Sequence, residues 1–243
     1  MRVERTRARG GAVAIPGYLV DTYWWAYVHP RAVRLFERQW LVNLILWGNF
    51  SRLRDAALDA LGGVLAGYTL QVACVYGNLT ERLLGRHAPD ARLDVVDVLP
   101  IQLDNLARKL RHGRGARLLH GDSAALPAPA ARYDRALIFF LLHEQPEHVR
   151  RATLAEALRV VKPGGRIVIV DYHRPSRRNP LYWPMRAVLR TLEPYALDLW
   201  RHDIAQWLPA DVRADALSQR TLFGGLYQVV TITVSANALD ESH

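Results

Sequence analysis

The chain has 243 residues, half of them apolar, and a formal net charge of +9. This length and composition allow a sizeable core and fit one α/β domain with an added cap better than two full domains. The excess positive charge favours nucleic acid, anionic lipid headgroups or phosphorylated substrates, without choosing among them. The only cysteine, Cys74, excludes a disulfide framework and indicates a reducing compartment. We interpret its thiol as part of a buried strand.

Two segments precede the predicted core. Residues 1–14 are rich in arginine and glycine, and we predict a disordered basic tail without a secretory signal. Residues 15–65 have a helical pattern in which Pro30 opens the longer helix. Their aromatic and aliphatic side chains suit a lid over an apolar substrate, a helix at a membrane interface or an ordinary packed cap. The apolar run from 40 to 47 is shorter than the ~20 residues that span a bilayer.

The core, predicted over 66–234, begins with the pattern of a nucleoside-binding fold. An apolar strand over 70–74 leads through a turn at 75–77 into a helix. A second strand, 93–96, is followed by Asp97, whose expected role is to bind ribose hydroxyls. A glycine-rich turn would have glycine at positions 73, 75 and 77, but only Gly77 is present. We therefore expect one end of the ligand to be held differently.

The remaining core alternates between helices and strands. The pattern predicts, in order, a helix from Pro100 to about 110, strands over 117–120 and 136–140, a helix over about 147–161, a turn at 162–165 and a strand over 167–170. A helical insertion over 175–210 follows, and 221–223 with 226–234 form an antiparallel pair at the sheet edge. We predict a single α/β domain with a doubly wound, mostly parallel seven-stranded sheet.

Several strings carry a resemblance to a known family. The turn at 162–165 followed by an apolar strand is similar to class I S-adenosylmethionine-dependent methyltransferases that act on ubiquinone and menaquinone precursors. Within that branch, residues 73–77, 97–103, 139–146 and 170–176 resemble the rhodoquinone-biosynthesis (RquA) family. The resemblance implies conversion of ubiquinone to rhodoquinone, in which an amino group derived from S-adenosylmethionine replaces a ring methoxy group. It also implies an association with manganese.

The resemblance assigns cofactor-binding roles around the first three strands. Asp97 would bind ribose and Asp122, with Ser123, would recognise adenine, although Asp122 could instead cap the following turn. Gln71 stands near the position where methyltransferases use an acid to hold the methionine end of the cofactor. The complete set of predicted cofactor-binding residues is Val72, Ala73, Cys74, Tyr76, Gly77, Asp97, Val98, Asp122, Ser123 and Phe140.

A second set of residues follows the fourth and fifth core strands. We predict a metal site, suited to Mn²⁺, made of His143, Glu144, Asp171 and His173. The predicted catalytic residues are Tyr76, His143, Asp171 and His173. The alternatives are that Tyr76 plugs the space under the cap and that the other residues only close or orient their loops.

These interpretations predict an enzyme that reaches ubiquinone in the membrane. We expect a cytoplasmic protein, peripherally associated with the inner membrane through an anionic lipid surface that includes Arg174, Arg177 and Arg178. The alternative enzyme is a methyltransferase acting on a ubiquinone or menaquinone precursor. A non-catalytic scaffold is a further alternative, and the absence of a recognised nucleic-acid module argues against nucleic acid as a partner.

Overall fold

The computed structural model describes residues 4–7, 14–23, 39–110, 115–210 and 217–235. An eight-stranded sheet with the order β1-β4-β3-β2-β5-β6-β8-β7 forms its centre. The strands are β1 (Glu4–Arg7), β2 (Tyr68–Val72), β3 (Arg92–Asp97), β4 (Arg117–His120), β5 (Tyr133–Phe139), β6 (Val161–Tyr172), β7 (Leu217–Leu222) and β8 (Tyr227–Thr233). Strands β1 to β6 pair in parallel, whereas β8 runs antiparallel to β6 and β7. The predicted mostly parallel, doubly wound sheet is therefore confirmed.

The N-terminal residues differ from the prediction. Glu4–Arg7, expected within a disordered tail, form β1 and pair with Arg117–His120 of β4. The edge of β4 would otherwise present unpaired backbone groups, which a parallel strand can satisfy whatever its side chains. This strand adds an eighth member to the predicted seven.

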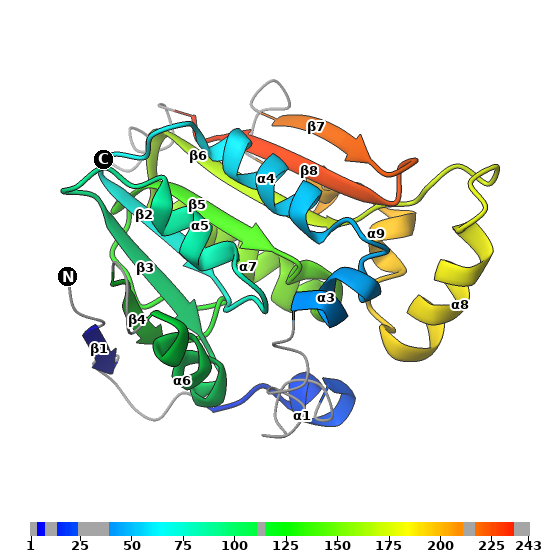
Figure 1. The fold of residues 1–243 in the computed structure, drawn as a ribbon, viewed down its shortest axis with the longest axis horizontal. Coiled ribbons are helices and arrows are strands. Elements are labelled where there is room, and N and C mark those ends of the chain that lie inside the picture. The colour runs from blue at the N-terminus through cyan, green and yellow to red at the C-terminus, as the bar shows by residue number, and fades with distance from the viewer. Residues whose placement is uncertain (1–3, 8–13, 24–38, 111–114, 211–216, 236–243) are drawn as a thin grey trace.

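Helices flank the sheet and extend beyond one of its edges. They are α1 (Gly17–Tyr23), α3 (Gln39–Ile45), α4 (Phe50–Leu61), α5 (Leu79–Gly85), α6 (Pro100–Lys109), η3 (Leu142–Glu144), α7 (Glu147–Val160), α8 (Tyr182–Leu192), α9 (Asp198–Arg201) and η4 (Ile204–Trp207). In Figure 1, α4 lies in front of the sheet and α7 behind it. Helices α1, α3 and α8 gather beyond the carboxyl ends of the parallel strands. They cover the edge where ligands bind in such folds.

The cap and the insertion are helical, as predicted. The longer helix expected to open at Pro30 begins outside the described residues. Helix α4 buries Phe50 and Leu53 completely, and α8 buries Met185 and Leu189. None of the helices in the described part of the chain has the length and hydropathy to cross a membrane.

Strand β6 is longer than the predicted strand because it includes the predicted turn. Tyr133 of β5 pairs with Val161, and the next register partners are Arg135 and Arg166, so residues 162–165 bulge out of the ladder. Gly164 adopts a φ of +75° and donates its N–H to the Val234 carbonyl. Glycine suits this position because it has no Cβ to oppose the left-handed conformation. The run 167–170 after the bulge is almost fully buried, as a central parallel strand requires.

Candidate active site

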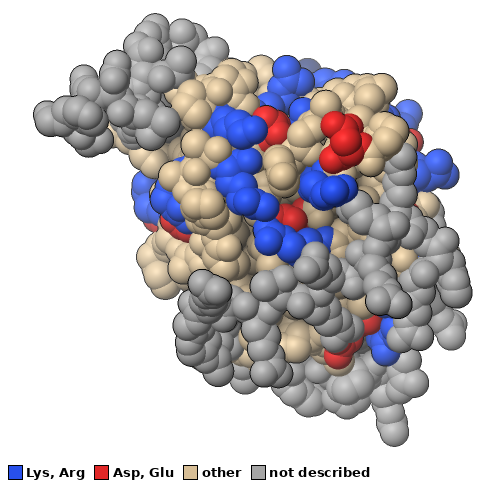
Figure 2. Space-filling view, turned by 90° about the vertical axis from the view of Figure 1, so that its left-hand side faces the viewer, with Lys and Arg blue, Asp and Glu red and all other residues tan. Residues whose placement is uncertain are grey.

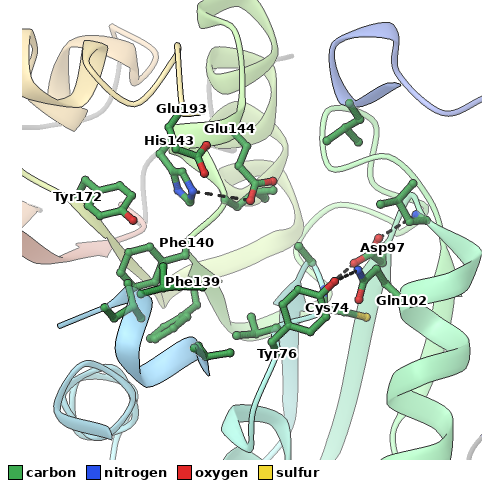
Figure 3. Close-up of a pocket in the computed structure, with 18 of the residues that line it drawn as sticks. Cys74, Tyr76, Asp97, Gln102, Phe139, Phe140, His143, Glu144, Tyr172 and Glu193 are labelled. Carbon is green, nitrogen blue, oxygen red and sulfur yellow. Dashed lines mark hydrogen bonds and ion pairs between the residues drawn. The ribbon is translucent and has the colours of Figure 1, made fainter. Parts of the chain in front are cut away.

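A cavity of about 720 Å³ lies at the carboxyl ends of the parallel strands, under α1, α3 and α8. Its volume is in the range of about 300–1,000 Å³ that small-molecule sites occupy. Figure 3 shows two groups of polar side chains in it. Tyr76, Asp97 and Gln102 lie on one side, whereas His143 and Glu144 lie on the other with Glu193 and Tyr172. We call these the nucleoside half and the histidine half.

The turn after β2 replaces a glycine-rich loop with larger side chains. Ala73 adopts a φ of +70°, a conformation that glycine takes more easily, and donates its N–H to the Val96 carbonyl. Gln71 is fully buried, donates its amide to the Ala73 carbonyl and accepts a hydrogen bond from Thr80 Oγ1. The position expected near the methionine end of a cofactor therefore contributes to holding the turn together.

Side chains of α4 and α6 contact the rest of this turn. A Cβ on Gly77, which has a φ of +79°, would come within 2.8 Å of the Phe50 ring. Lys109 donates a hydrogen bond to the Gly77 carbonyl, and Gln102 donates one to the Tyr76 hydroxyl over 2.8 Å. Gly77 thus permits close packing of α4, and Tyr76 is positioned beside Asp97 (Figure 3). The Tyr76 ring forms part of the nucleoside half.

Asp97 is a buried carboxylate that still faces the cavity. It accepts hydrogen bonds from the backbone N–H groups of Cys74 and Leu99 over 2.7 and 2.8 Å. Burial raises the pKa of Asp97 to about 6, although these bonds oppose the shift. The Cys74 thiol is a third hydrogen-bond partner of this carboxylate. A carboxylate has about four acceptor sites, so capacity for a ligand hydroxyl remains. Ribose binding by Asp97 stays a prediction that this geometry permits.

Other predicted nucleoside contacts have local partners as well. Asp122 accepts the Ala124 N–H over 2.8 Å, so it does cap its turn, and it also lines the cavity. The Ser123 hydroxyl bonds with Thr153 and accepts a hydrogen bond from Gln145. Cys74 lies beyond the end of β2 and lines the cavity, so the expectation of a buried strand thiol is wrong. The strand ends two residues earlier because the backbone turns at Ala73.

The histidine half is organised around Asp171. This fully buried carboxylate accepts hydrogen bonds from the N–H groups of Leu142, His143 and Tyr172. Its Oδ1 also lies 3.0 Å from Nδ1 of His143. Three backbone donors and a neighbouring imidazole surround this one carboxylate. Asp171 therefore positions the loop and the imidazole.

The imidazole of His143 faces several acids. Burial lowers its pKa, but the charges of Asp171, Glu193 and Glu144 outweigh burial and raise it to about 9. Glu144 Oε1 lies 3.7 Å from its Nε2. Burial, reinforced by neighbouring groups, also raises the pKa of Tyr172 well above its usual value. At neutral pH this half of the cavity therefore has an imidazolium beside a neutral phenol.

A buried arginine supports the same loop from behind. Arg150 of α7 is fully buried and donates hydrogen bonds to the carbonyl groups of Leu142, Gln145 and Tyr195 over 2.8–3.1 Å. Its guanidinium lies 4.2 Å from the centre of the Trp207 ring. It ties the loop that carries His143 to the helical insertion. Sequence reasoning missed Arg150 because a helical arginine is ordinarily solvated.

The predicted manganese site is not assembled. Within the described residues, no group of three or more His, Cys, Asp or Glu side chains is placed to hold a metal ion. Asp171 is fully buried among three backbone donors and does not line the cavity. Nδ1 of His173 lies 2.8 Å from the Gly225 carbonyl, also away from the cavity lining. His173 diverges because β6 ends at Tyr172, which itself occupies the position facing the cavity. The predicted ligand set does not fit a metal.

The other predicted site residues are near the cavity, with two outside its lining. Ala73, Tyr76, Val98 and Phe140 line it, whereas Val72 and Gly77 do not. Val72 pairs within the sheet, and Gly77 faces Phe50. Further lining residues were missed, among them Tyr18, Gln102 and Glu193, because they come from α1, α6 and the residue after α8. Burial and the charges of Glu144 and Asp122 raise the pKa of Tyr18, which lines the cavity from α1.

Comparisons with known proteins agree with this architecture. A family model described as "Methyltransferase domain" matches residues 69–165. The chain is 30% identical to a demethylmenaquinone methyltransferase of Renibacterium salmoninarum over 76% of its own length and 81% of the relative's. It is 32% identical to the ubiquinone/menaquinone biosynthesis C-methyltransferase UbiE of Paracoccus denitrificans, over 60% of this chain and 58% of that one.

Among solved structures, human N-acetylserotonin methyltransferase in complex with S-adenosylmethionine superposes with a TM-score of 0.64. The two share 15% identity, and the match covers 91% of this chain and 60% of the human chain. Sheet order and pocket therefore define the class I S-adenosylmethionine-dependent methyltransferase fold. The chain belongs to the methyltransferase family that includes the demethylmenaquinone methyltransferases. The acids at the ends of β3 and β4 fit the cofactor of this family.

Proposed function

We propose that this enzyme replaces a methoxy group on the ring of ubiquinone by an amino group derived from S-adenosylmethionine, which yields rhodoquinone. The observation that carries the proposal is the modified turn after β2. Gln71 is committed to Ala73 and Thr80, so it offers no acid to the methionine end of a cofactor. Asp97 and Asp122 remain in place for the nucleoside end. The departures from the usual turn thus concentrate where the cofactor's amine would lie.

The charge of the cavity supports a cationic cofactor. Asp97, Asp122, Glu144 and Glu193 line it, and in the described part of the chain no lysine or arginine does. This is notable in a protein with a net charge of +9. The apolar remainder of the lining suits a quinone ring with an isoprenoid tail. Both features are expected if cofactor and quinone meet in one cavity.

The cofactor supplies the group that is transferred, here its amine. In the proposed exchange, a carbon–nitrogen bond to the ring would form and the carbon–oxygen bond to methoxide would break. The bond between that nitrogen and the α-carbon of the cofactor would then break by elimination, in which the neighbouring cofactor carbon loses a proton and the nitrogen gains one, so that the ring keeps a free amino group. The His143 imidazolium can hydrogen-bond a quinone oxygen and donate the proton that releases methoxide as methanol, and the amine loses a proton in return. Asp171 keeps the imidazole charged and oriented. Tyr76 lies at the nucleoside half, where it can contact the amine.

A second candidate is carbon methylation of a quinone precursor, and the named relatives favour it. Both are methyltransferases of quinone biosynthesis by name. This reaction would need His143 as a base that removes a proton from a ring hydroxyl. Because the imidazole is protonated at neutral pH, such a reaction should accelerate as the pH rises toward about 9. Amino exchange assisted by the imidazolium should instead slow above that pH.

Doubly labelled S-adenosylmethionine, with heavy nitrogen in the amine and deuterium in the methyl group, separates the two reactions. The purified enzyme is incubated with ubiquinone or its demethylated precursor, with and without Mn²⁺, and the quinone is analysed by mass spectrometry. We expect a ubiquinone product that has lost methoxy and gained heavy nitrogen. A product that gains the deuterated methyl group instead would establish the second candidate. Absence of any labelled quinone with either substrate would reject both.

A further inference from the structure

Two helices beside the cavity leave large apolar side chains in solvent. On α3 and just after it, and on α8, seven such residues are between 41% and 64% exposed. We call them the mouth surface, and they are Trp40, Leu44, Ile45, Trp47, Trp183, Val188 and Leu192. Isolated exposed apolar residues are ordinary, but a cluster of this kind marks an interaction site.

The two helices form one surface. The indole N–H of Trp47 points to Sδ of Met185 on α8 over 3.0 Å, which brings the end of α3 against α8. Several members of the mouth surface also line the cavity, among them Leu44, Ile45 and Val188. The solvent-exposed apolar surface therefore continues into the cavity wall. A molecule that entered there would remain in apolar surroundings.

The charged side chains of α8 and of the segment before it have one sign. Residues 39–49 contain no charged side chain. From Arg174 to Leu192 the chain has five arginines, all exposed, and no acidic residue. The arginines are Arg174, Arg177, Arg178, Arg186 and Arg190. The guanidinium of Arg186 lies 5.6 Å from the centre of the Trp183 ring. Interfacial tryptophan with neighbouring arginine is the composition that binds anionic bilayers.

We propose that the mouth surface docks on an anionic lipid bilayer. Trp40 and Trp183 insert at the level of the headgroups, the arginines of 174–190 contact lipid phosphates, and the cavity opens toward the acyl chains. An isoprenoid substrate then passes between bilayer and cavity without crossing water. The surface itself follows from exposure and charge, and only the identity of the substrate rests on the proposed function.

The opposite side of the molecule provides a control. Figure 2 shows lysine and arginine gathered on the face away from α3 and α8, with acidic side chains among them. Arg135 of β5 is the register partner of Arg166 of β6, and Arg117 of β4 is the register partner of Asp94 of β3. Arg117 also pairs with Asp94, and Lys162 pairs with Asp134. Binding driven by positive charge alone would use this face as readily as the mouth surface.

Sedimentation with vesicles of phosphatidylcholine, alone or mixed equally with phosphatidylglycerol, tests the docking. Trp40→Ser/Trp183→Ser removes aromatic anchors that do not line the cavity, and Arg177→Gln/Arg178→Gln removes two charges. Arg92→Gln/Arg166→Gln removes two exposed charges on the opposite side. The full-length variants are first compared by thermal unfolding, so that only folded proteins are scored.

We expect wild type to bind the mixed vesicles in a salt-sensitive manner. The tryptophan pair should weaken binding by about tenfold or more. The Arg177→Gln/Arg178→Gln variant should bind the mixed vesicles about thirtyfold more weakly than wild type. The Arg92→Gln/Arg166→Gln variant should bind them nearly as well as wild type. Equal binding by all variants, or loss only in the 92/166 pair, would overturn the proposal. A concentration-dependent dimer that the tryptophan pair abolishes, without vesicle binding, would assign the surface to a second copy instead.

Turnover separates this proposal from the proposed function. Docking variants should process a short-chain quinone in solution like wild type but lose turnover of long-chain quinone in vesicles. If no quinone is processed while the vesicle-binding pattern holds, the proposed function fails and the docking surface stands. If turnover in vesicles is equal in all variants, docking through this surface fails although the chemistry stands.

Discussion

The ends of β3 and β6 have the same local pattern but different roles. In each strand a buried apolar run comes directly before an aspartate, Asp97 or Asp171. Asp97 receives two backbone N–H groups and lines the cavity. Asp171 receives three, together with the imidazole of His143, and has no exposed surface. The number of internal donors therefore decides whether a strand-terminal acid can bind a ligand or only positions its neighbours.

The largest expected effect concerns Asp171. Asp171→Ala removes the acceptor for three N–H groups and the main counter-charge of a buried imidazolium. Breaking a buried ion pair on one side typically costs about 3–5 kcal/mol, so we expect a loss of that size in the free energy of unfolding. Denaturant unfolding of the purified variant measures it. A loss below about 1 kcal/mol would contradict the positioning role and reopen the question of a ligand at Asp171.

The next effect is a pH dependence of stability. His143 has a folded-state pKa of about 9, above its ordinary value of 6.5. Its charge therefore stabilises the fold fully below pH 6.5, and this contribution is lost as the pH rises through about 9. The shift corresponds to about 3 kcal/mol.

Denaturant unfolding between pH 6 and 10 measures this loss. His143→Gln, which cannot titrate, is the matched control and should flatten the curve. A similar slope in both proteins would mean that another group is responsible.

Asp97 should affect binding more than folding. Asp97→Asn keeps the side chain's size but removes charge-assisted hydrogen bonds to ribose, worth about 1.5–3 kcal/mol, or roughly 10- to 150-fold in affinity. Calorimetric titration with S-adenosylmethionine measures it. Because burial raises the pKa of Asp97 to about 6, affinity of wild type should also fall as the pH drops below 6.

The same raised pKa predicts a small opposite effect on folding. The folded state holds the Asp97 proton more tightly than the unfolded state, so this group lowers stability as the pH rises from about 4 to 6. Asp97→Asn should therefore not destabilise the protein. A strong loss of stability would mean that the backbone bonds to Cys74 and Leu99 need the negative charge, and Asp97 would then resemble Asp171.

The smallest effect is expected at Ala73. Its φ of +70° disfavours an L-residue by about 1–2 kcal/mol, whereas glycine there loses more entropy on folding. Ala73→Gly should raise the free energy of unfolding by up to about 1 kcal/mol, and thermal unfolding measures it. Ala66→Gly, in the loop before β2, serves as a comparison for the entropic cost alone. A destabilised Ala73→Gly variant would show that the turn depends on the alanine methyl group.

The sequence alone determined the order and type of the core elements. Local backbone preferences can be read from apolar runs such as 167–170, from helix signals such as Pro100 and from glycine turns. The folded protein keeps these preferences in its strands, helices and turns. Asp97 was predictable for the same reason, since its position follows from the end of a strand. The existence of a helical cap and a helical insertion was also readable, because amphipathic composition is a local property.

Only the tertiary structure decided which polar groups have capacity for a ligand. Gln71 and Asp171 bind internal partners, His173 faces Gly225, and Arg150 is buried behind the loop. The approach of Trp47 to Met185, which joins α3 and α8 at the cavity mouth, is equally non-local. Hydrogen-bond saturation and burial depend on segments that are far apart in the chain. A pattern of residue types therefore predicts where an acid lies, but not how many donors will reach it.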